Sequence, residues 1–207
     1  MTPATLSCNS SHLMFADPWL ERWLPLVVER SQHAPVLEMG CGYGDDTVTL
    51  VNAGLNVLAF DMQPTCVAMT KMRAPKADVE CRDIRSAFPQ NWTKFAVIVA
   101  SLSLHYFSWE QTQAIIQKIR FSLLPGGLLL CRVNATDDHN FGAGTGLQVE
   151  ANFYAAQKQM KRFFDEDALE RLFAKDWRVL SREHIITNKY VQAKALWELV
   201  LEKPGNE

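Results

Sequence analysis

The sequence predicts an α/β domain built on a doubly wound, mostly parallel sheet of seven strands that closes with a C-terminal antiparallel hairpin. Two observations lead to this Rossmann-like fold class. Short apolar runs alternate with helix-like segments along most of the chain, and two longer β-rich runs end it. Alternating strands and helices form right-handed crossovers, so helices should cover both faces of the sheet. A length of 207 residues fits one domain with a substantial core.

The expected strands are short and rich in apolar residues. The run 95–100 has the unbroken apolar pattern of a strand buried on both faces. The final hairpin should turn at Asn188 and Lys189. The full set of expected strands comprises residues 36–39, 57–60, 79–82, 95–100, 128–133, 177–187 and 190–201.

The expected helices lie between these runs, at residues 17–29, 44–53, 63–74, 108–124 and 165–174. Pro25 should bend or interrupt the first helix, because proline cannot donate a backbone hydrogen bond. Ser108 and Gln111 have the spacing of a capping box, and the helix that they begin should end before Pro125. Asp165 should begin the last helix.

Residues 134–163 interrupt the alternation with a stretch that contains three glycines. Long loops are uncommon in compact domains and often serve as lids or binding loops. We therefore expect an active-site lid here, with a short helix around residues 148–156. Its aromatic and cationic residues could cover a bound molecule. Residues 1–16 are expected to form an N-terminal tail to a domain that spans residues 1–207.

Composition argues against several classes of protein. The net charge of −2 gives no strong electrostatic footprint for nucleic acid or an anionic membrane. No apolar stretch reaches the roughly 20 residues of a membrane span, and residues 1–15 lack the features of a secretory signal. Five cysteines without CxxC pairing are typical of reduced thiols. We expect a cytoplasmic protein with neither nucleic acid nor membrane as a partner; its oligomeric state stays open.

The most informative segment is residues 36–44, which read Val-Leu-Glu-Met-Gly-Cys-Gly-Tyr-Gly. Gly40, Gly42 and Gly44 alternate strictly after an apolar run that contains Glu38. Glycine suits a backbone that turns with positive φ or lies bare against a ligand, and the following helix start adds free N–H groups. Dinucleotide enzymes use Gly-x-Gly-x-x-Gly. Here the third glycine comes one residue early, and Glu38 would repel a pyrophosphate.

The pattern acid-x-Gly-x-Gly-x-Gly resembles motif I of the class I S-adenosylmethionine-dependent methyltransferases. The resemblance spans about residues 17–203. It implies S-adenosyl-L-methionine as the cofactor and S-adenosyl-L-homocysteine as its product. It also implies that Glu38 hydrogen-bonds to the turn backbone or to the methionine part of the cofactor. The turn residues that it places at the cofactor are Gly40, Cys41, Gly42 and Gly44.

Two acids follow the next strands. Asp61 comes 21 residues after Gly40, the separation that a βαβ unit needs. In the family an acid at this position accepts hydrogen bonds from the ribose hydroxyls, and the residue matching Met62 lies against the adenine face. Asp83 matches the acid that accepts a hydrogen bond from the adenine amine, with Ile84 packing on the ring. For each acid the alternative is an ordinary surface acid at a strand end.

Residues 101–106, Ser-Leu-Ser-Leu-His-Tyr, follow the fourth strand, where the family places the acceptor. They lack both the Pro-Pro-aromatic motif of enzymes that methylate amines of adenine or glutamine and the Pro-Cys nucleophile of cytosine C5 enzymes. The segment is similar to small-molecule methyltransferases, including the tellurite-resistance and thiol branch. Ser101 and Leu102 are expected at the cofactor. His105 is a candidate catalytic residue, as a base or a positioning group, and Tyr106 is the second candidate.

The run Asp137-Asp138-His139-Asn140 offers oxygen ligands of the kind that Mg²⁺ or Ca²⁺ takes. All four residues are consecutive, whereas a metal site normally gathers ligands from separate segments. We therefore favour a solvated or acceptor-facing loop and expect no metal.

Together these features predict a methyltransferase that moves a methyl group to a small-molecule acceptor by in-line displacement. The acceptor would be a soft sulfur, selenium or tellurium nucleophile, or an oxygen or nitrogen nucleophile. A soft acceptor would need no protein base. Two alternatives stay open: a non-catalytic S-adenosylmethionine-binding protein, and a less favoured nicotinamide-dependent oxidoreductase.

Overall fold

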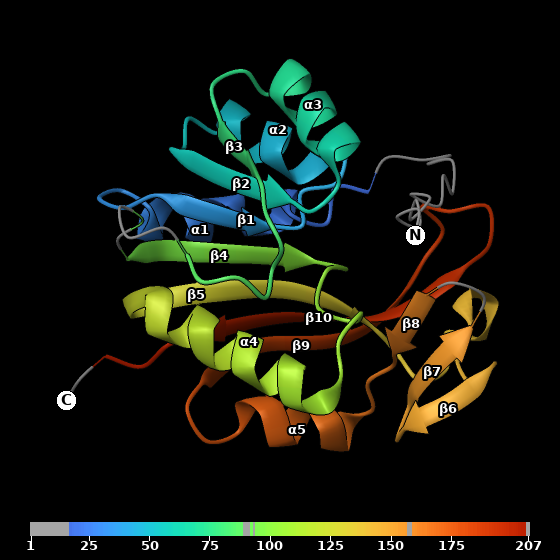
Figure 1. The fold of residues 1–207 in the computed structure, drawn as a ribbon. Helices are drawn as coiled ribbons and strands as arrows, with labels where there is room; N and C mark the ends of the chain where they lie inside the picture. The colour runs from blue at the N-terminus through green and yellow to red at the C-terminus, as the bar shows by residue number, and fades with distance from the viewer. Residues whose placement is uncertain (1–16, 89–91, 93, 157–158, 206–207) are drawn as a thin grey trace.

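A seven-stranded sheet in the order β3-β2-β1-β4-β5-β10-β9 carries the fold (Figure 1). The computed structural model describes residues 17–88, 92, 94–156 and 159–205. The parallel strands are β1 (Val36–Met39), β2 (Val57–Asp61), β3 (Asp78–Cys81), β4 (Phe95–Ser101) and β5 (Leu123–Asn134). The antiparallel strands are β9 (Arg178–Thr187) and β10 (Lys194–Glu202). The predicted doubly wound sheet with its terminal hairpin is confirmed.

Helices cover both faces of this sheet. One face carries the 3₁₀ turn η1 (Glu21–Trp23) and the helices α1 (Leu24–Arg30), α2 (Asp45–Asn52) and α3 (Pro64–Arg73). The other carries α4 (Trp109–Ser122) and α5 (Glu166–Phe173). The capping box of Ser108 and Gln111 is present at the start of α4, and the Asp165 carboxylate caps α5 as expected.

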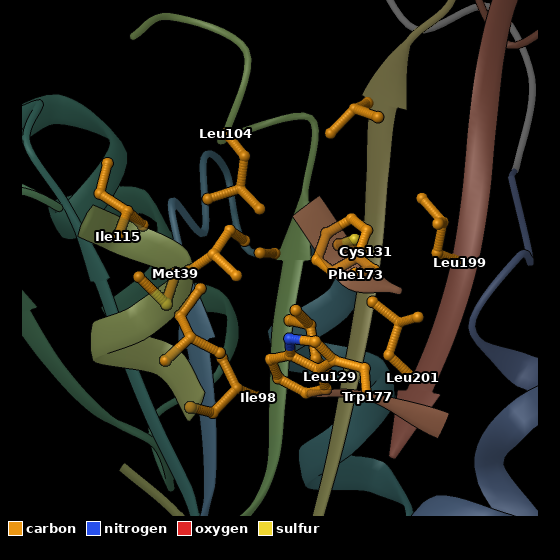
Figure 2. Close-up of a cluster of buried hydrophobic side chains, with 14 of the residues drawn as sticks. Met39, Ile98, Leu104, Ile115, Leu129, Cys131, Phe173, Trp177, Leu199 and Leu201 are labelled. Atoms are coloured by element: carbon orange, nitrogen blue, oxygen red, sulfur yellow. The ribbon is translucent and has the colours of Figure 1, made fainter. Parts of the chain in front are cut away.

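The central strands divide their side chains between two cores because successive residues of a strand point to opposite faces. On β4, Val97 and Val99 pack with α1 and α2, whereas Ile98 packs with α4 and α5. Figure 2 shows the second core, in which Met39 and Ile98 lie near Ile115 of α4. Burial on both faces explains the unbroken apolar pattern of these strands.

Three boundaries differ from the prediction. The helix expected at residues 17–29 is a 3₁₀ turn followed by α1, and Pro25 lies in the first turn of α1, where its missing N–H costs nothing. Strand β5 begins at Leu123 because this residue already pairs with Phe95 of β4, ahead of a register shift in which Gly126 has a φ of 74°. The hairpin connection is longer than two residues, since β10 begins at Lys194.

Residues 134–163 contain a separate three-stranded antiparallel sheet, so the helix expected around residues 148–156 is wrong. The sheet comprises β6 (Leu147–Glu150), β7 (Phe153–Ala156) and β8 (Gln159–Arg162), after a 3₁₀ turn η2 (His139–Phe141). Arg162 fixes it through a salt bridge to Glu150 and a hydrogen bond to the Ala151 carbonyl. The small sheet lies beside the carboxyl ends of β4 and β5 (Figure 1). Movement as a lid stays a prediction.

No helix in the described ranges is both long and apolar enough to cross a membrane.

Candidate active site

The three alternating glycines form the turn between β1 and α2. Gly40, Gly42 and Gly44 have φ angles of 77°, 54° and 84°, where an L side chain is strained. A Cβ on Gly40 would lie 2.6 Å from the Ser103 Cβ, whereas a Cβ on Gly42 would meet nothing within 4 Å. Gly40 thus lets the segment after β4 pack on the turn, and Gly42 leaves bare backbone beside open space.

Asp61 joins this turn to the end of β2. Its Oδ2 accepts a hydrogen bond from the Gly42 N–H at 3.0 Å, and its Oδ1 accepts one from the Gln63 N–H at 2.8 Å. A carboxylate offers about four acceptor sites, so two remain for a ligand. Met62 follows with 51% of its surface exposed. Asp61 therefore lies beside the turn with Met62 next to it, and their contacts with ribose and adenine stay predictions.

Glu38 is buried beneath the turn, and a side chain of α2 holds it. Its Oε2 accepts a hydrogen bond from the hydroxyl of Thr47. Burial, with the nearby carboxylate of Asp46, raises the pKa of Glu38 well above its usual range. The charges of Asp45 and Asp61 act in the same direction. The turn is consequently rich in acids, of which Asp45 is paired with Arg73 and Asp46 lies near the charge of Arg132.

A side chain of helix α3 holds the turn in place. The Thr70 hydroxyl donates to the Gly42 carbonyl at 2.9 Å, and a Cβ on Gly44 would lie 2.9 Å from the Thr70 side chain. The Cys41 Sγ lies 3.6 Å from the Thr70 Oγ1 and packs inward, where burial raises the pKa of the thiol. Cys41 would therefore meet a ligand through its backbone rather than its sulfur.

Asp83 lies beyond β3, next to the strand that ends at Asp61. Both of its oxygens accept hydrogen bonds from the guanidinium of Arg85, which lowers the pKa of the carboxyl group. Ile84 is 8% exposed and belongs to the main core. The structure thus brings Asp83 to the expected edge of the sheet but pairs it with an arginine, and it turns Ile84 into the core.

The segment after β4 is held by Arg132 of β5. The Ser101 Oγ accepts a hydrogen bond from the Arg132 Nε at 3.0 Å, and the Leu102 N–H donates to the Arg132 carbonyl at 2.9 Å. Leu102 has a φ of 53°, a left-handed conformation that is strained for a residue with a side chain. Such strain gathers at ligand-binding sites, where the surrounding structure enforces it.

His105 is 4% exposed, and its Nδ1 has no hydrogen-bond partner among the described residues. Burial, followed by the charges of Lys194 and Lys161, lowers the pKa of His105 well below 6.5. The imidazole is therefore neutral at neutral pH. The Tyr106 ring centroid lies 4.2 Å from that of His105, and Tyr106 is exposed. The role of His105 as a base stays a prediction.

Sequence patterns alone did not reveal the network around Arg132. This buried guanidinium binds the Asp17 carboxylate at 2.5 Å and lies 4.4 Å from the centroid of the Trp19 ring. The Trp19 indole N–H in turn donates to Asp46 at 2.9 Å. One signal was available: Arg132 is a lone cation within the apolar run 128–133.

The consecutive polar residues after β5 have separate protein partners. Asp138 is buried and accepts hydrogen bonds from the Lys194 ammonium at 2.6 Å and the Ala195 N–H at 3.1 Å. Asp137 bonds to His184, and the Asn140 amide donates to the Ala193 carbonyl. Within the described ranges, no group of three His, Cys, Asp or Glu residues is arranged to hold a metal ion. The loop instead fastens η2 to the hairpin.

Part of the chain is similar in sequence to known methyltransferases. Residues 36–127 match the family model of a methyltransferase domain. An uncharacterised methyltransferase of Synechocystis sp. is 30% identical over 111 residues, which are 52% of each chain. A carboxy-S-adenosyl-L-methionine synthase of Vibrio campbellii is 28% identical over 108 residues, 47% of this chain and 43% of that protein. The chain thus spans about half the length, or less, of the curated relatives that it matches.

Solved structures share the fold over most of the chain. A SAM-dependent methyltransferase from Methanosarcina mazei has a TM-score of 0.73 and 15% identity, covering 92% of this chain and 99% of that one. The N-methyltransferase NodS from Bradyrhizobium japonicum, solved with S-adenosyl-L-homocysteine, has a TM-score of 0.64 and 17% identity, covering 93% and 94%. The predicted Rossmann-like fold is confirmed.

A substitution at Gly40 tests how the turn is built. Gly40→Ala should lower the free energy of unfolding by about 2–5 kcal/mol, because it adds left-handed strain and a clash with Ser103. The matched control Gly54→Ala has a similar φ of 82° but meets nothing within 4 Å, so it should cost only about 1–2 kcal/mol. Urea denaturation measures both. Equal losses would show that the close approach of Ser103 is not a constraint.

The buried imidazole predicts a dependence of stability on pH. Because the pKa of His105 is lowered in the folded protein, the unfolded chain binds this proton first as the pH falls. The contribution of the neutral imidazole to the free energy of unfolding is complete above about pH 6.5. Below that pH it is lost, at up to about 1.4 kcal/mol per pH unit. Denaturation of wild type and His105→Gln between pH 7 and 5 should show a shallower fall in the variant. Parallel curves for wild type and His105→Gln would contradict a buried neutral His105.

Proposed function

We propose that this protein is an S-adenosylmethionine-dependent methyltransferase that acts on a small-molecule acceptor. The methyltransferase domain matched by residues 36–127, together with the fold, supports the enzyme class and the cofactor. The observation that carries the proposal is the alternating-glycine turn. Its Gly42 backbone borders open space, and its N–H is held on the Asp61 carboxylate.

The charges around the turn suit this cofactor. The charges of Asp45, Asp46 and Asp61 all act on the buried Glu38 at this turn. A ligand with an ammonium and a sulfonium would be attracted there, whereas the pyrophosphate of a dinucleotide would be repelled. In this proposal Asp61 accepts hydrogen bonds from two ribose hydroxyls through its remaining acceptor sites. The bare backbone of Gly40 and Gly42 accommodates the methionine part.

Catalysis would rest mainly on positioning and on the exclusion of water. When bound, the cofactor supplies a sulfonium methyl group; the bond from acceptor to carbon forms as the carbon–sulfur bond breaks, and its electron pair stays on sulfur. The chain's part is to hold Asp61 at the glycine turn and to pack the segment after β4 on Gly40, with Ser101 and Leu102 held by Arg132. These residues keep the carboxyl ends of β1, β2 and β4 in one place.

We favour a soft acceptor, such as a thiol, selenide or telluride. Because its lowered pKa makes His105 a weak base, the site suits a nucleophile that reacts as an anion without help from the protein. The resemblance of residues 101–106 to the tellurite-resistance and thiol branch agrees with this choice. The proposal keeps the expectations of a cytoplasmic protein and of no nucleic-acid or membrane partner.

One relative carries the name of a synthase that makes carboxy-S-adenosyl-L-methionine, so a similar domain can serve a different reaction. An acceptor screen separates the possibilities. The protein is incubated with S-adenosylmethionine and a thiol, selenide, tellurite, phenol or amine, and S-adenosylhomocysteine is measured by mass spectrometry. Turnover should be fastest with a soft acceptor. Binding of the cofactor without turnover of any acceptor would instead support a non-catalytic or different role.

Asp61 gives the sharpest test of the cofactor site. Asp61→Asn removes the charged acceptor, so the affinity for S-adenosylhomocysteine should fall by roughly 10- to 150-fold, the equivalent of about 1.5–3 kcal/mol. The control is Asp78→Asn, which changes an exposed acid at the start of β3. Asp78 therefore lies at the amino ends of the parallel strands, away from the glycine turn. Calorimetry should find its affinity unchanged. An unchanged dissociation constant for Asp61→Asn would show that the ribose is held elsewhere.

A further inference from the structure

Buried polar atoms without partners gather beyond β4 and at the end of β5. Within the part of the chain that the structure describes, they include the Ser103 Oγ, the His105 Nδ1 and both polar side-chain atoms of Asn134. Asn134 is 1% exposed and is the last residue of β5. Native proteins pair nearly all buried polar groups, because leaving one unpaired costs free energy. These four atoms therefore call for a partner that the described chain does not supply.

Backbone hydrogen bonds bring His105 and Asn134 close together, and Ser103 lies against the glycine turn. The Arg162 N–H donates to the His105 carbonyl at 2.7 Å, and the Phe164 N–H donates to the Asn134 carbonyl at 2.8 Å. Arg162 and Phe164 are two positions apart on one segment, so the backbones of His105 and Asn134 that they bind lie near each other. Ser103 packs against Gly40, since a Cβ on that glycine would lie 3.4 Å from the Ser103 Oγ. The unpartnered atoms accordingly extend from the glycine turn to the small sheet.

Two lysines, the buried Lys194 and the half-buried Lys161, lie near these atoms and interact with one carboxylate, that of Asp138. The Lys194 ammonium forms a salt bridge with the Asp138 carboxylate at 2.6 Å, and the charge of the same carboxylate acts on Lys161. The Lys161 Nζ also lies 3.5 Å from the Phe141 carbonyl, and both lysine charges act on His105. The neighbouring Arg162 is paired with Glu150. With a neutral His105, the two lysines and Asp138 together carry one excess positive charge.

We propose that Ser103, His105, Asn134, Lys161 and Lys194, here named the acceptor cluster, bind the acceptor and select one that carries a carboxylate or another oxyanion. This inference rests on the proposed function, because it places the acceptor next to the glycine turn. The Asn134 amide both donates to and accepts from the acceptor, and His105 provides a second hydrogen bond. Lys161 supplies the counter-charge, while Lys194 acts by holding Asp138.

Other acceptor classes fit the cluster less well. An apolar acceptor would leave the Asn134 amide and the His105 Nδ1 unpaired in a buried place. A cationic acceptor would meet two ammonium groups with only one carboxylate between them. An anion with hydrogen-bonding oxygens satisfies both requirements at once.

The test compares pairs of probes that share a nucleophile but differ in charge. The pairs are 3-mercaptopropionate with 2-mercaptoethanol, and 4-hydroxybenzoate with phenol. For wild type the anionic member should have the higher kcat/KM by about tenfold or more, the effect of one charged hydrogen bond. Lys161→Met should bring the ratio close to one. Lys175→Met, an exposed lysine after α5, is the control and should leave the ratio unchanged. A wild-type ratio near one would overturn the inference.

Asn134→Leu separates binding from structure. It replaces an unpartnered amide by an apolar side chain of similar size, so the variant should fold with equal or greater stability. Its affinity for 3-mercaptopropionate should nevertheless fall by about tenfold. A variant that is more stable and binds this probe as wild type does would show that Asn134 takes no part in the site.

A binding measurement keeps this inference distinct from the proposed function. Calorimetry records 3-mercaptopropionate and 2-mercaptoethanol binding to the protein saturated with S-adenosylhomocysteine. Preference for the anion, lost in Lys161→Met, supports the acceptor cluster even if no probe is methylated. If S-adenosylhomocysteine itself does not bind, the proposed function fails, and the same two probes are compared on the ligand-free protein. Equal affinities in either case contradict the cluster.

Discussion

Close approach between the turn after β1 and the segment after β4 is the constraint on which the site depends. It requires Gly40, because any side chain there would collide with Ser103. The same turn requires left-handed φ angles at Gly42 and Gly44, and it is held from two sides by Asp61 and Thr70. Strands β2, β1 and β4 are neighbours in the sheet. The turn therefore lies where the sheet order reverses, the position at which open α/β sheets bind ligands.

The fold followed from the sequence because its signals are local and periodic. Apolar runs gave the central strands, and side-chain caps gave the starts of α4 and α5. Predictions failed where tertiary contacts decide the structure. The small sheet of residues 147–162 is fixed by Arg162, whose partners come from separate segments, so its short strands carry no clear local pattern. The start of β10 depends on its pairing with β9 in the same way.

The residues of the candidate site also differ in whether the sequence alone locates them. The glycines, Asp61 and Asp83 could be located from spacing, since each lies at the end of a strand or shortly after it. Thr47, Thr70 and Arg132 could not, because their roles arise when helices and strands far apart in sequence pack together. Polar residues inside apolar strands were the available signal. Arg132 and Asn134 both fit that description in β5, and Glu38 fits it in β1.

Charge separates the two sides of the proposed site. Acids gather around the glycine turn, where a cationic cofactor is expected, and lysines gather near the small sheet. The central claim is that the turn accepts S-adenosylmethionine and not a dinucleotide. Calorimetry with S-adenosylmethionine, S-adenosylhomocysteine, NAD and NADP tests it most directly. Binding of the first two without the nicotinamide cofactors is the predicted result. Tight binding of NAD, with no response to S-adenosylmethionine, would contradict it.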